Sequence, residues 1–289
     1  MISVIVCSIN ESARSAFAGE LAATIGVPYE LILVKNEEEK LSICAAYNKG
    51  ASRAKYPFFC FVHEDLTFHT PGWGAGLVRC LETPGAGMLG FAGSTMKTHS
   101  PSPWWITHED PLALPFRRLH YIQSGIRQSR PAESEQLLQE VLCLDGFFLA
   151  CSKTTWEITG FDERTLRGFH FYDMDISLSA HAKGLKNYVY TGCWVEHHSS
   201  GSLNIDWVRG AEAFQRKWRG RLPLSLQPVP AGEQKELERL ALVDYLYVLV
   251  KTGCRWLWLK YFFRLIRKYG NSPSARMVGK VYLKQFLPS

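Results

Sequence analysis

The fold of this protein is decided by the stretch Phe58-Phe59-Cys60-Phe61-Val62-His63-Glu64-Asp65. Its first five residues are continuously apolar, as in a β-strand that is buried on both faces of a sheet. Three polar residues follow at once, so we expect their side chains to stand at the carboxyl end of this strand. A strand of this kind is typical of the centre of an α/β protein.

Two further strands are predicted before this stretch, at residues 2–9 and 29–34. Between the strands, apolar residues recur at helical spacing over residues 13–25 and 41–51. The alternation of strand and helix predicts an α/β fold with a mostly parallel sheet, flanked by helices and joined by right-handed crossovers. In such sheets, ligands bind at the carboxyl ends of the strands.

Polar side chains follow each predicted strand at that edge. Ser8 follows the first strand, Asn36 follows the second, and His63-Glu64-Asp65 follows the third. The chain has neither a G-x-G-x-x-G turn after its first strand nor a G-x-x-x-x-G-K-[ST] loop. Both common phosphate-binding loops are therefore absent from the sequence, and a nucleotide would be held in another way.

The middle of the chain is less regular. A strand is predicted at residues 87–92, and a Pro- and Trp-rich stretch follows from residue 95 to residue 131. A connection of this length is usually functional or disordered. Its aromatic residues favour a folded lid or a substrate-facing loop, and they are Trp104, Trp105, Phe116 and Tyr121. After it, we expect a helix at residues 133–142 and a strand at residues 144–150.

The composition is that of a globular protein, with 46% hydrophobic and 21% charged residues among 289. This apolar content is enough for one large domain or two unequal ones. The eight cysteines include no C-x-x-C pair and several lie in apolar runs, so we expect buried reduced thiols in a cytoplasmic protein. We expect no signal peptide and no membrane-spanning helix.

The residue types of His63 and Asp65 suit a metal site. An imidazole and a carboxylate two residues apart could both reach one divalent cation, and a diphosphate could supply its remaining oxygen ligands. The alternative is a turn whose acidic residues cap the next helix. From these three residues alone, both interpretations stay open.

Further segments carry a family resemblance. They are Ala46-Tyr47-Asn48-Lys49-Gly50-Ala51, Gly160-Phe161-Asp162-Glu163, Tyr172-Asp173-Met174-Asp175 and Val195-Glu196-His197-His198. In this order they resemble the family 2 inverting glycosyltransferases, which use nucleotide sugars to build surface polysaccharides and have the Rossmann-like GT-A fold. The resemblance spans residues 2–218. The family's D-x-D reads His63-Glu64-Asp65 here, as in a branch with H-x-D, and its Glu-Asp pair reads Tyr172-Asp173.

The resemblance implies a role for each matching residue. Asp65 would be the principal ligand of Mn²⁺ or Mg²⁺, His63 would contact the metal or a ribose, and His197 or His198 would approach the same ion. Asp173 would be the general base. The residues implied in nucleotide-sugar binding are Ser8, Asn36, Asn48, Glu64 and Asp145, the last of them on the acceptor side.

These residue types fit the transfer of a sugar to a hydroxyl group. A divalent ion stabilises the leaving diphosphate, and one carboxylate takes the proton of the acceptor, so one base suffices. Asp173 and Asp175 lie ~200° apart around a helix, and the motif selects Asp173. Alternatively, both carboxylates could simply interact favourably with the positive end of the helix dipole. An imidazole ligand favours Mn²⁺ over Mg²⁺.

The implied function is therefore a metal-dependent inverting glycosyltransferase. Its partners would be a UDP- or GDP-type donor and a glycan or lipid-linked acceptor. The alternative is a catalytically silent GT-A-like module that binds a nucleotide or a glycan.

The C-terminal part of the chain is strongly basic. Residues 214–289 carry 15 basic and 4 acidic side chains, whereas residues 1–213 carry 18 and 23. We expect a catalytic domain at residues 1–220 and a helical extension at residues 221–289. Residues 256–269 predict an amphipathic helix, with Trp258, Phe262 and Ile266 among its apolar residues. That apolar face would either lie peripherally on the inner membrane surface or pack against the protein. Nucleic-acid binding is not expected.

Overall fold

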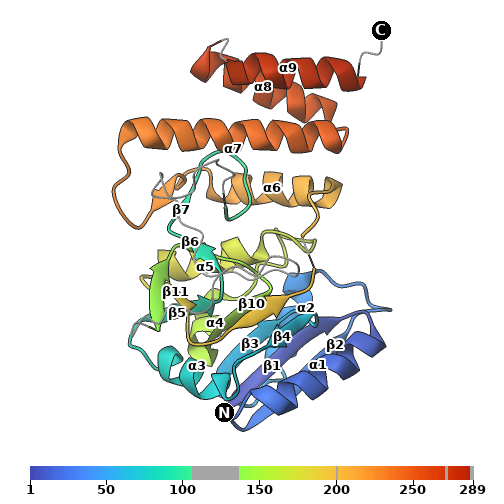
Figure 1. Cartoon of the computed structure of the whole chain (residues 1–289), viewed down its shortest axis with the longest axis vertical. Coiled ribbons are helices and arrows are strands. Elements are labelled where there is room, and N and C mark those ends of the chain that lie inside the picture. Colours follow the sequence, from blue (N-terminus) through green and yellow to red (C-terminus); the bar gives the residue numbers. More distant parts are fainter. Residues whose placement is uncertain (106–136, 200, 271–272, 287–289) are drawn as a thin grey trace.

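The computed structural model describes residues 1–105, 137–199, 201–270 and 273–286. A central sheet flanked by helices occupies one end of the molecule, and a stack of helices occupies the other (Figure 1). The strand order of the sheet is β2-β1-β3-β10-β5-β11-β8. Its strands are β1 (Ile2–Ser8), β2 (Tyr29–Lys35), β3 (Phe58–Val62), β5 (Ala86–Gly90), β8 (Leu138–Val141), β10 (Phe148–Ser152) and β11 (Lys186–Tyr190).

The predicted α/β fold is confirmed. β1 is parallel to both β2 and β3, and β5 is parallel to β11. β10 runs antiparallel between β3 and β5, and β8 runs antiparallel at the edge. Because β1 lies between β2 and β3, the carboxyl ends of these three strands meet at one edge of the sheet. Ser8, Asn36 and His63 all stand at that edge.

Helices cover the sheet and extend beyond it. They are α1 (Glu11–Thr24), α2 (Ile43–Ala51), α3 (Trp73–Leu81), α4 (Lys153–Thr159), α5 (Tyr172–Ala182), α6 (Ile205–Trp218), α7 (Ala231–Lys251), α8 (Arg255–Tyr269) and α9 (Pro273–Phe286). Local sequence sets several of their starts. The Asn10 side chain accepts hydrogen bonds from the first N–H groups of α1, and Ser42 and Asn204 cap α2 and α6 in the same way.

Three short antiparallel ladders hold the loops above the sheet. They pair β4 (Leu66–Phe68) with β12 (Val195–His197), β6 (Gly93–Ser94) with β9 (Cys143–Leu144), and β7 (Met96–Lys97) with β13 (Leu224–Ser225). Each ladder joins segments that are far apart in the sequence. These pairings therefore bring distant polar residues to the carboxyl edge of the sheet.

Two predictions about the middle of the chain were wrong. The helix expected at residues 133–142 is not formed in its described part, because Leu138–Val141 pairs with β11 as strand β8. Backbone pairing at the sheet edge thus overrides the local helical preference. The strand expected at residues 144–150 is divided at Asp145 into β9 and β10. Most of the stretch expected as a lid, including Phe116 and Tyr121, lies outside the described residues.

The C-terminal helices pack against the rest of the chain. Glu238 of α7 is buried, and its carboxylate accepts hydrogen bonds from the backbone N–H of His99 and from the N–H and hydroxyl of Ser100. The apolar face expected at residues 256–269 packs within this stack, since the rings of Trp258 and Tyr282 stack 3.8 Å apart. The domain division at residue 220 stays a prediction.

Two further expectations can be compared with the structure. In the described part of the chain, no helix is both long and apolar enough to span a membrane. All eight cysteines are free, and six of them are buried, so the prediction of buried thiols is confirmed for these six. The other two, Cys7 and Cys254, are half-buried.

Candidate active site

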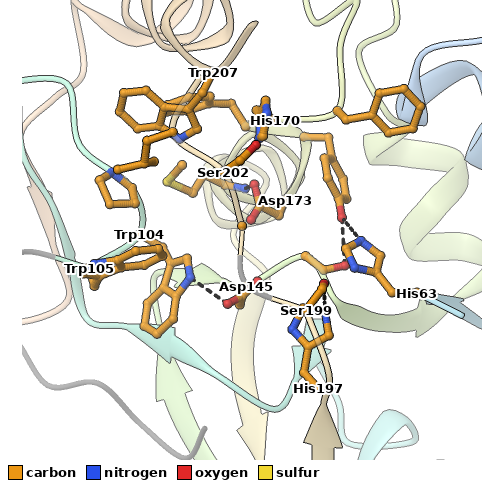
Figure 2. A pocket seen from close by; sticks show the side chains of 18 residues that line it. His63, Trp104, Trp105, Asp145, His170, Asp173, His197, Ser199, Ser202 and Trp207 are labelled. Carbon is orange, nitrogen blue, oxygen red and sulfur yellow. Dashed lines mark hydrogen bonds between the residues drawn. The ribbon is translucent and has the colours of Figure 1, made fainter. Parts of the chain in front are cut away.

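A cavity of about 340 Å³ lies above the carboxyl edge of the sheet. His63, Asp145, Asp173 and His197 are among the residues that line it. In Figure 2, the two carboxylates lie between the histidines on one side and Trp104, Trp105 and Trp207 on the other. Residues from five separate segments of the chain thus share one hollow.

One end of the cavity holds a possible metal-binding group, the trio His63, Asp65 and His197. One potential ligand atom from each residue lies within 4.8 Å of those from the other two. The ladder between β4 and β12 creates this group, because it places His197 opposite Leu66, the neighbour of Asp65. His197 Nε2 lies 3.4 Å from Asp65 Oδ1. Two imidazoles and one carboxylate are a donor set that can hold a divalent transition-metal ion.

The electrostatics of the trio also suit a cation. Burial, together with the nearby His197, lowers the pKa of His63 to about 4. Burial alone would raise the pKa of Asp65, but hydrogen bonds from His197 and Ser199 hold that pKa well below its usual range. At neutral pH, His63 is therefore a neutral imidazole and Asp65 is ionised, which are the forms that bind metal.

A hydrogen-bond chain fixes the orientation of His63. The hydroxyl of Tyr172 donates to the carbonyl oxygen of Gly146 at 2.9 Å, and it also lies 2.9 Å from His63 Nε2. Because the single hydroxyl hydrogen is used on Gly146, His63 Nε2 carries the proton and donates to Tyr172. The lone pair of His63 is then on Nδ1, where it is available to a metal ion.

His198, the other histidine considered, is not part of the trio. Its Nε2 lies 2.8 Å from the hydroxyl of Thr67, and its side chain is exposed. Its backbone N–H donates to the carbonyl oxygen of Asp65. His198 directly follows strand β12, and alternation along the extended chain explains the difference, since successive side chains point to opposite faces.

Asp173 stands at the start of α5 and lines the cavity. Burial, with a further contribution from the nearby carboxylate of Asp145, raises its pKa to about 7. The residue before the helix, Phe171, has a φ of 69°, a left-handed conformation that is strained for a residue with a side chain. Strain of this kind is common at functional sites.

Asp175 points away from Asp173, as the helical spacing predicts. Its carboxylate accepts hydrogen bonds from the indole Nε1 of Trp218 at 2.7 Å and from Lys217 Nζ at 2.8 Å. It is buried and does not line the cavity. Its role is to join α5 to α6.

Asp145 lies in the turn between β9 and β10. Its Oδ2 accepts a hydrogen bond of 2.9 Å from the indole Nε1 of Trp104, and burial raises its pKa. The next residue is Gly146, where a Cβ atom would overlap the ring of Tyr172. Only glycine therefore allows this turn to approach α5 so closely.

The residues implied in nucleotide binding are more dispersed. Ser8, Asn36 and Asn48 do not line the cavity. The side chain of Asn36 forms hydrogen bonds with both the N–H and the carbonyl oxygen of Leu41. The side-chain amide of Asn48 forms hydrogen bonds with Phe161, Trp156 and Glu163. These contacts hold loops together, and the binding roles of the three residues stay predictions.

Glu64 does not line the cavity either, but it has an unsatisfied oxygen. Its Oε2 is buried and has no hydrogen-bond partner among the described residues. A buried carboxylate oxygen without a partner is costly, so it indicates a site where a donor group of a ligand binds. This feature is consistent with the nucleotide-sugar role implied for Glu64.

Three residues of the cavity wall were not predicted from the sequence. Phe169, His170 and Trp207 line the same hollow as Trp104 and Trp105. Phe169 is 52% exposed, whereas Trp207 is buried and packs against Phe171 with ring centroids 5.1 Å apart. Aromatic residues in such segments usually belong to the hydrophobic core. No pattern in the sequence therefore distinguished these three residues from core residues.

The fold defines an α/β protein with a cavity at the carboxyl edge of a mostly parallel sheet. The chain belongs to the glycosyltransferase-like family, whose model matches residues 3–215. No curated protein matches it.

One solved structure places this fold among the GT-A-like folds. The structure of GalNAc-T7 with UDP, GalNAc and Mn²⁺ matches with a TM-score of 0.51 and 14% identity, over 73% of this chain and 47% of that chain. The present chain thus spans about half of that protein. A197 from STIV matches with a TM-score of 0.37 and 11% identity, over 69% of this chain and 86% of that chain.

Proposed function

We propose that this protein is an inverting, metal-dependent glycosyltransferase that moves a sugar from a nucleoside diphosphate to a hydroxyl group. The observation that carries this proposal is the shared cavity of His63, His197 and Asp173, with Asp65 beside the two histidines. A cation site and a separate buried carboxylate on one hollow are what such a transfer requires.

His63, Asp65 and His197 would hold the metal ion. When bound, Mn²⁺ or Mg²⁺ would stabilise the negative charge of the leaving diphosphate. The structure of GalNAc-T7, which contains UDP and Mn²⁺, supports this pairing of a nucleotide and a metal for the fold. Tyr172 would hold the ring of His63 in the required orientation through its hydrogen bond.

Asp173 would take the proton from the acceptor hydroxyl. A carboxylate with a pKa of about 7 is a stronger base than an ordinary aspartate and is still largely ionised at slightly alkaline pH. Asp173 lines the same cavity as His63 and His197 of the metal trio. The acceptor could therefore approach the sugar from the side opposite the leaving group, as inversion of the anomeric carbon requires.

Glu64 would bind the nucleotide part of the donor. Its unsatisfied Oε2 offers an acceptor to a ribose hydroxyl or a base N–H. Asp145 would bind a hydroxyl group of a sugar through the oxygen atoms that Trp104 leaves free for a second hydrogen bond.

The aromatic wall supports a glycan as the acceptor. Sugar rings carry apolar C–H faces, and these pack on exposed aromatic rings such as that of Phe169. Among the described residues that line the cavity there is no Lys or Arg. The wall therefore offers stacking surfaces and carboxylates, which suit an uncharged sugar better than a phosphate group.

Isothermal titration of the full chain with UDP and GDP, with and without Mn²⁺, tests the proposal. We expect one of the two nucleotides to bind much more tightly with the metal. A subsequent screen of donors and acceptors by mass spectrometry should show transfer of a sugar. Absence of metal-dependent binding would refute the proposal, and binding without transfer would identify a catalytically silent nucleotide-binding module.

A further inference from the structure

The last two helices present an outer face composed of hydrophobic and cationic side chains. We define this outer face by Trp256, Phe263 and Arg267 of α8 and by Arg276, Lys280 and Leu283 of α9. It lies at the end of the molecule opposite the sheet (Figure 1). Trp256 is 85% exposed, Phe263 is 67% exposed and Leu283 is 52% exposed.

The packing of α8 explains why its large side chains are exposed. Tyr261 and Leu265 are buried, and the ring of Tyr261 lies 4.9 Å from that of Tyr245 in α7. At ~100° per residue, Trp256 and Phe263 lie on the opposite side of α8 from this contact. The amphipathic helix therefore has two hydrophobic surfaces, one packed in the helix stack and one facing solvent.

The packing of α9 gives the same orientation. Ala275 and Val278 are fully buried, and Gly279 lies against the ring of Phe262 in α8. Arg276 and Lys280 are exposed and lie on the opposite side of α9 from Val278. The cations of α9 therefore point away from the helix stack, as Trp256 and Phe263 of α8 do.

The charge of this part of the chain is of one sign. Asp244 is the last acidic residue, and nine Lys and Arg residues follow it. An aromatic and cationic surface without any acidic residue is complementary to a surface of anionic lipids.

We infer that the outer face of α8 and α9 binds the surface of an anionic membrane. Trp256, Phe263 and Leu283 enter the boundary between headgroups and acyl chains, while the cations contact the headgroups. This is a different surface from the one expected from the sequence, since Trp258 and Phe262 pack inside the helix stack. The attachment is peripheral and does not depend on the chemistry in the cavity.

Co-sedimentation of the full chain with lipid vesicles tests this inference. We expect binding to vesicles of phosphatidylcholine mixed with phosphatidylglycerol, little binding to phosphatidylcholine alone, and weaker binding at high salt. Each cation contributes about 1 kcal/mol near such a surface. The double variant Arg267→Gln, Lys280→Gln should therefore bind at least about tenfold more weakly.

A second double variant, Trp256→Ser, Phe263→Ser, should lose binding by a similar or larger factor. Ile158→Ser is its matched control, because Ile158 is also exposed but lies in α4. All these positions are at the surface, and an unchanged melting temperature confirms folding. The nucleotide titration, run on the same samples, should be unaffected and reports separately on the proposed function.

Several results would overturn the inference. They are equal binding to both kinds of vesicle, no binding to either, and unchanged binding by the double variants. Light scattering after size-exclusion chromatography could give one more result that overturns the inference. A dimer in the absence of lipid that Trp256→Ser disrupts would assign the outer face to a second copy of the chain.

Discussion

The hydroxyl of Tyr172 lies 2.9 Å from Nε2 of His63 and links the metal trio to the helix that carries Asp173. Tyr172 and Asp173 are adjacent, so the two halves of the proposed chemistry are held by neighbouring residues of α5. The same hydroxyl donates a hydrogen bond to the carbonyl oxygen of Gly146. The distance between the metal trio and the base is therefore fixed by rigid structure.

Loss of this hydroxyl should weaken metal binding. Tyr172→Phe removes the acceptor of the His63 N–H, so the ring is no longer held with Nδ1 toward the metal. We expect the affinity for Mn²⁺ to fall by about 10- to 100-fold, as for other residues that orient a metal ligand. Titration calorimetry with Mn²⁺ measures it. Tyr190→Phe, a buried hydroxyl in β11, is the control, and equal effects of the two variants would contradict the orientation.

Asp65→Ala should abolish the effect of metal on nucleotide binding. The carboxylate of Asp65 is the only anionic group in the described trio, and its pKa is held low, so it supplies the charge that a divalent cation needs. Nucleotide titrations with and without Mn²⁺ should then give the same weak affinity. Asp206→Ala, on the exposed side of α6, is the control. A variant that keeps metal-dependent affinity would remove Asp65 from the site.

Replacement of the base should separate catalysis from binding. We expect Asp173→Asn to lower kcat by roughly 10²-fold or more, the contribution of a positioned base, because the amide cannot accept the proton. Nucleotide affinity should persist, since the metal trio is intact. Steady-state rates and titrations on the same samples provide both values. A nearly normal kcat would exclude Asp173 as the base.

The pH dependence should report the raised pKa of Asp173. The base works in its ionised form, so kcat/KM should rise with pH and level off above a pKa of about 7. Below that pH, the value should fall about tenfold per pH unit. An ordinary aspartate would give a flat profile from pH 5 upward, and such a profile would contradict the assignment. Rates measured at constant ionic strength decide between the two.

Glu238 should stabilise the segment that carries Trp104 of the aromatic wall, although Glu238 itself does not line the cavity. Glu238→Ala leaves buried donors of His99 and Ser100 without an acceptor, and each such loss costs about 1–3 kcal/mol. We expect a free energy of unfolding lower by at least about 3 kcal/mol and a raised KM for the acceptor, because the segment leading to Trp104 is loosened. Denaturant titration and acceptor kinetics measure both. Glu233→Ala, at a partly exposed residue in the first turn of α7, is the control.

Much of the fold could be predicted from local patterns. The run from Phe58 to Val62 is apolar on both faces, and only a central strand of a covered sheet buries such a run. The position of His63 and Asp65 after that strand followed directly. A helix that begins near Asp173 was also predicted. In such a helix, the side chains of Asp173 and Asp175 point in different directions.

Contacts between distant segments could not be predicted in the same way. The choice of His197 over His198 depends on the ladder of β12 with β4, and the strand β8 at residues 138–141 depends on pairing with β11. The wall formed by Phe169 and Trp207 joins a loop to the first turn of α6, which is far from it in the sequence. Local sequence sets the type and period of an element, whereas packing across the chain decides which faces meet.

The two surfaces of α8 show the same division. Its amphipathic period was visible in the sequence, and the charge of the last part of the chain was a matter of counting. Only the contacts with α7 and α9 decided that Trp258 lies inside and Trp256 outside. A period gives the relative angle between side chains, but the direction of the helix face toward its neighbours is a property of the tertiary structure, because it depends on which surfaces exclude water together.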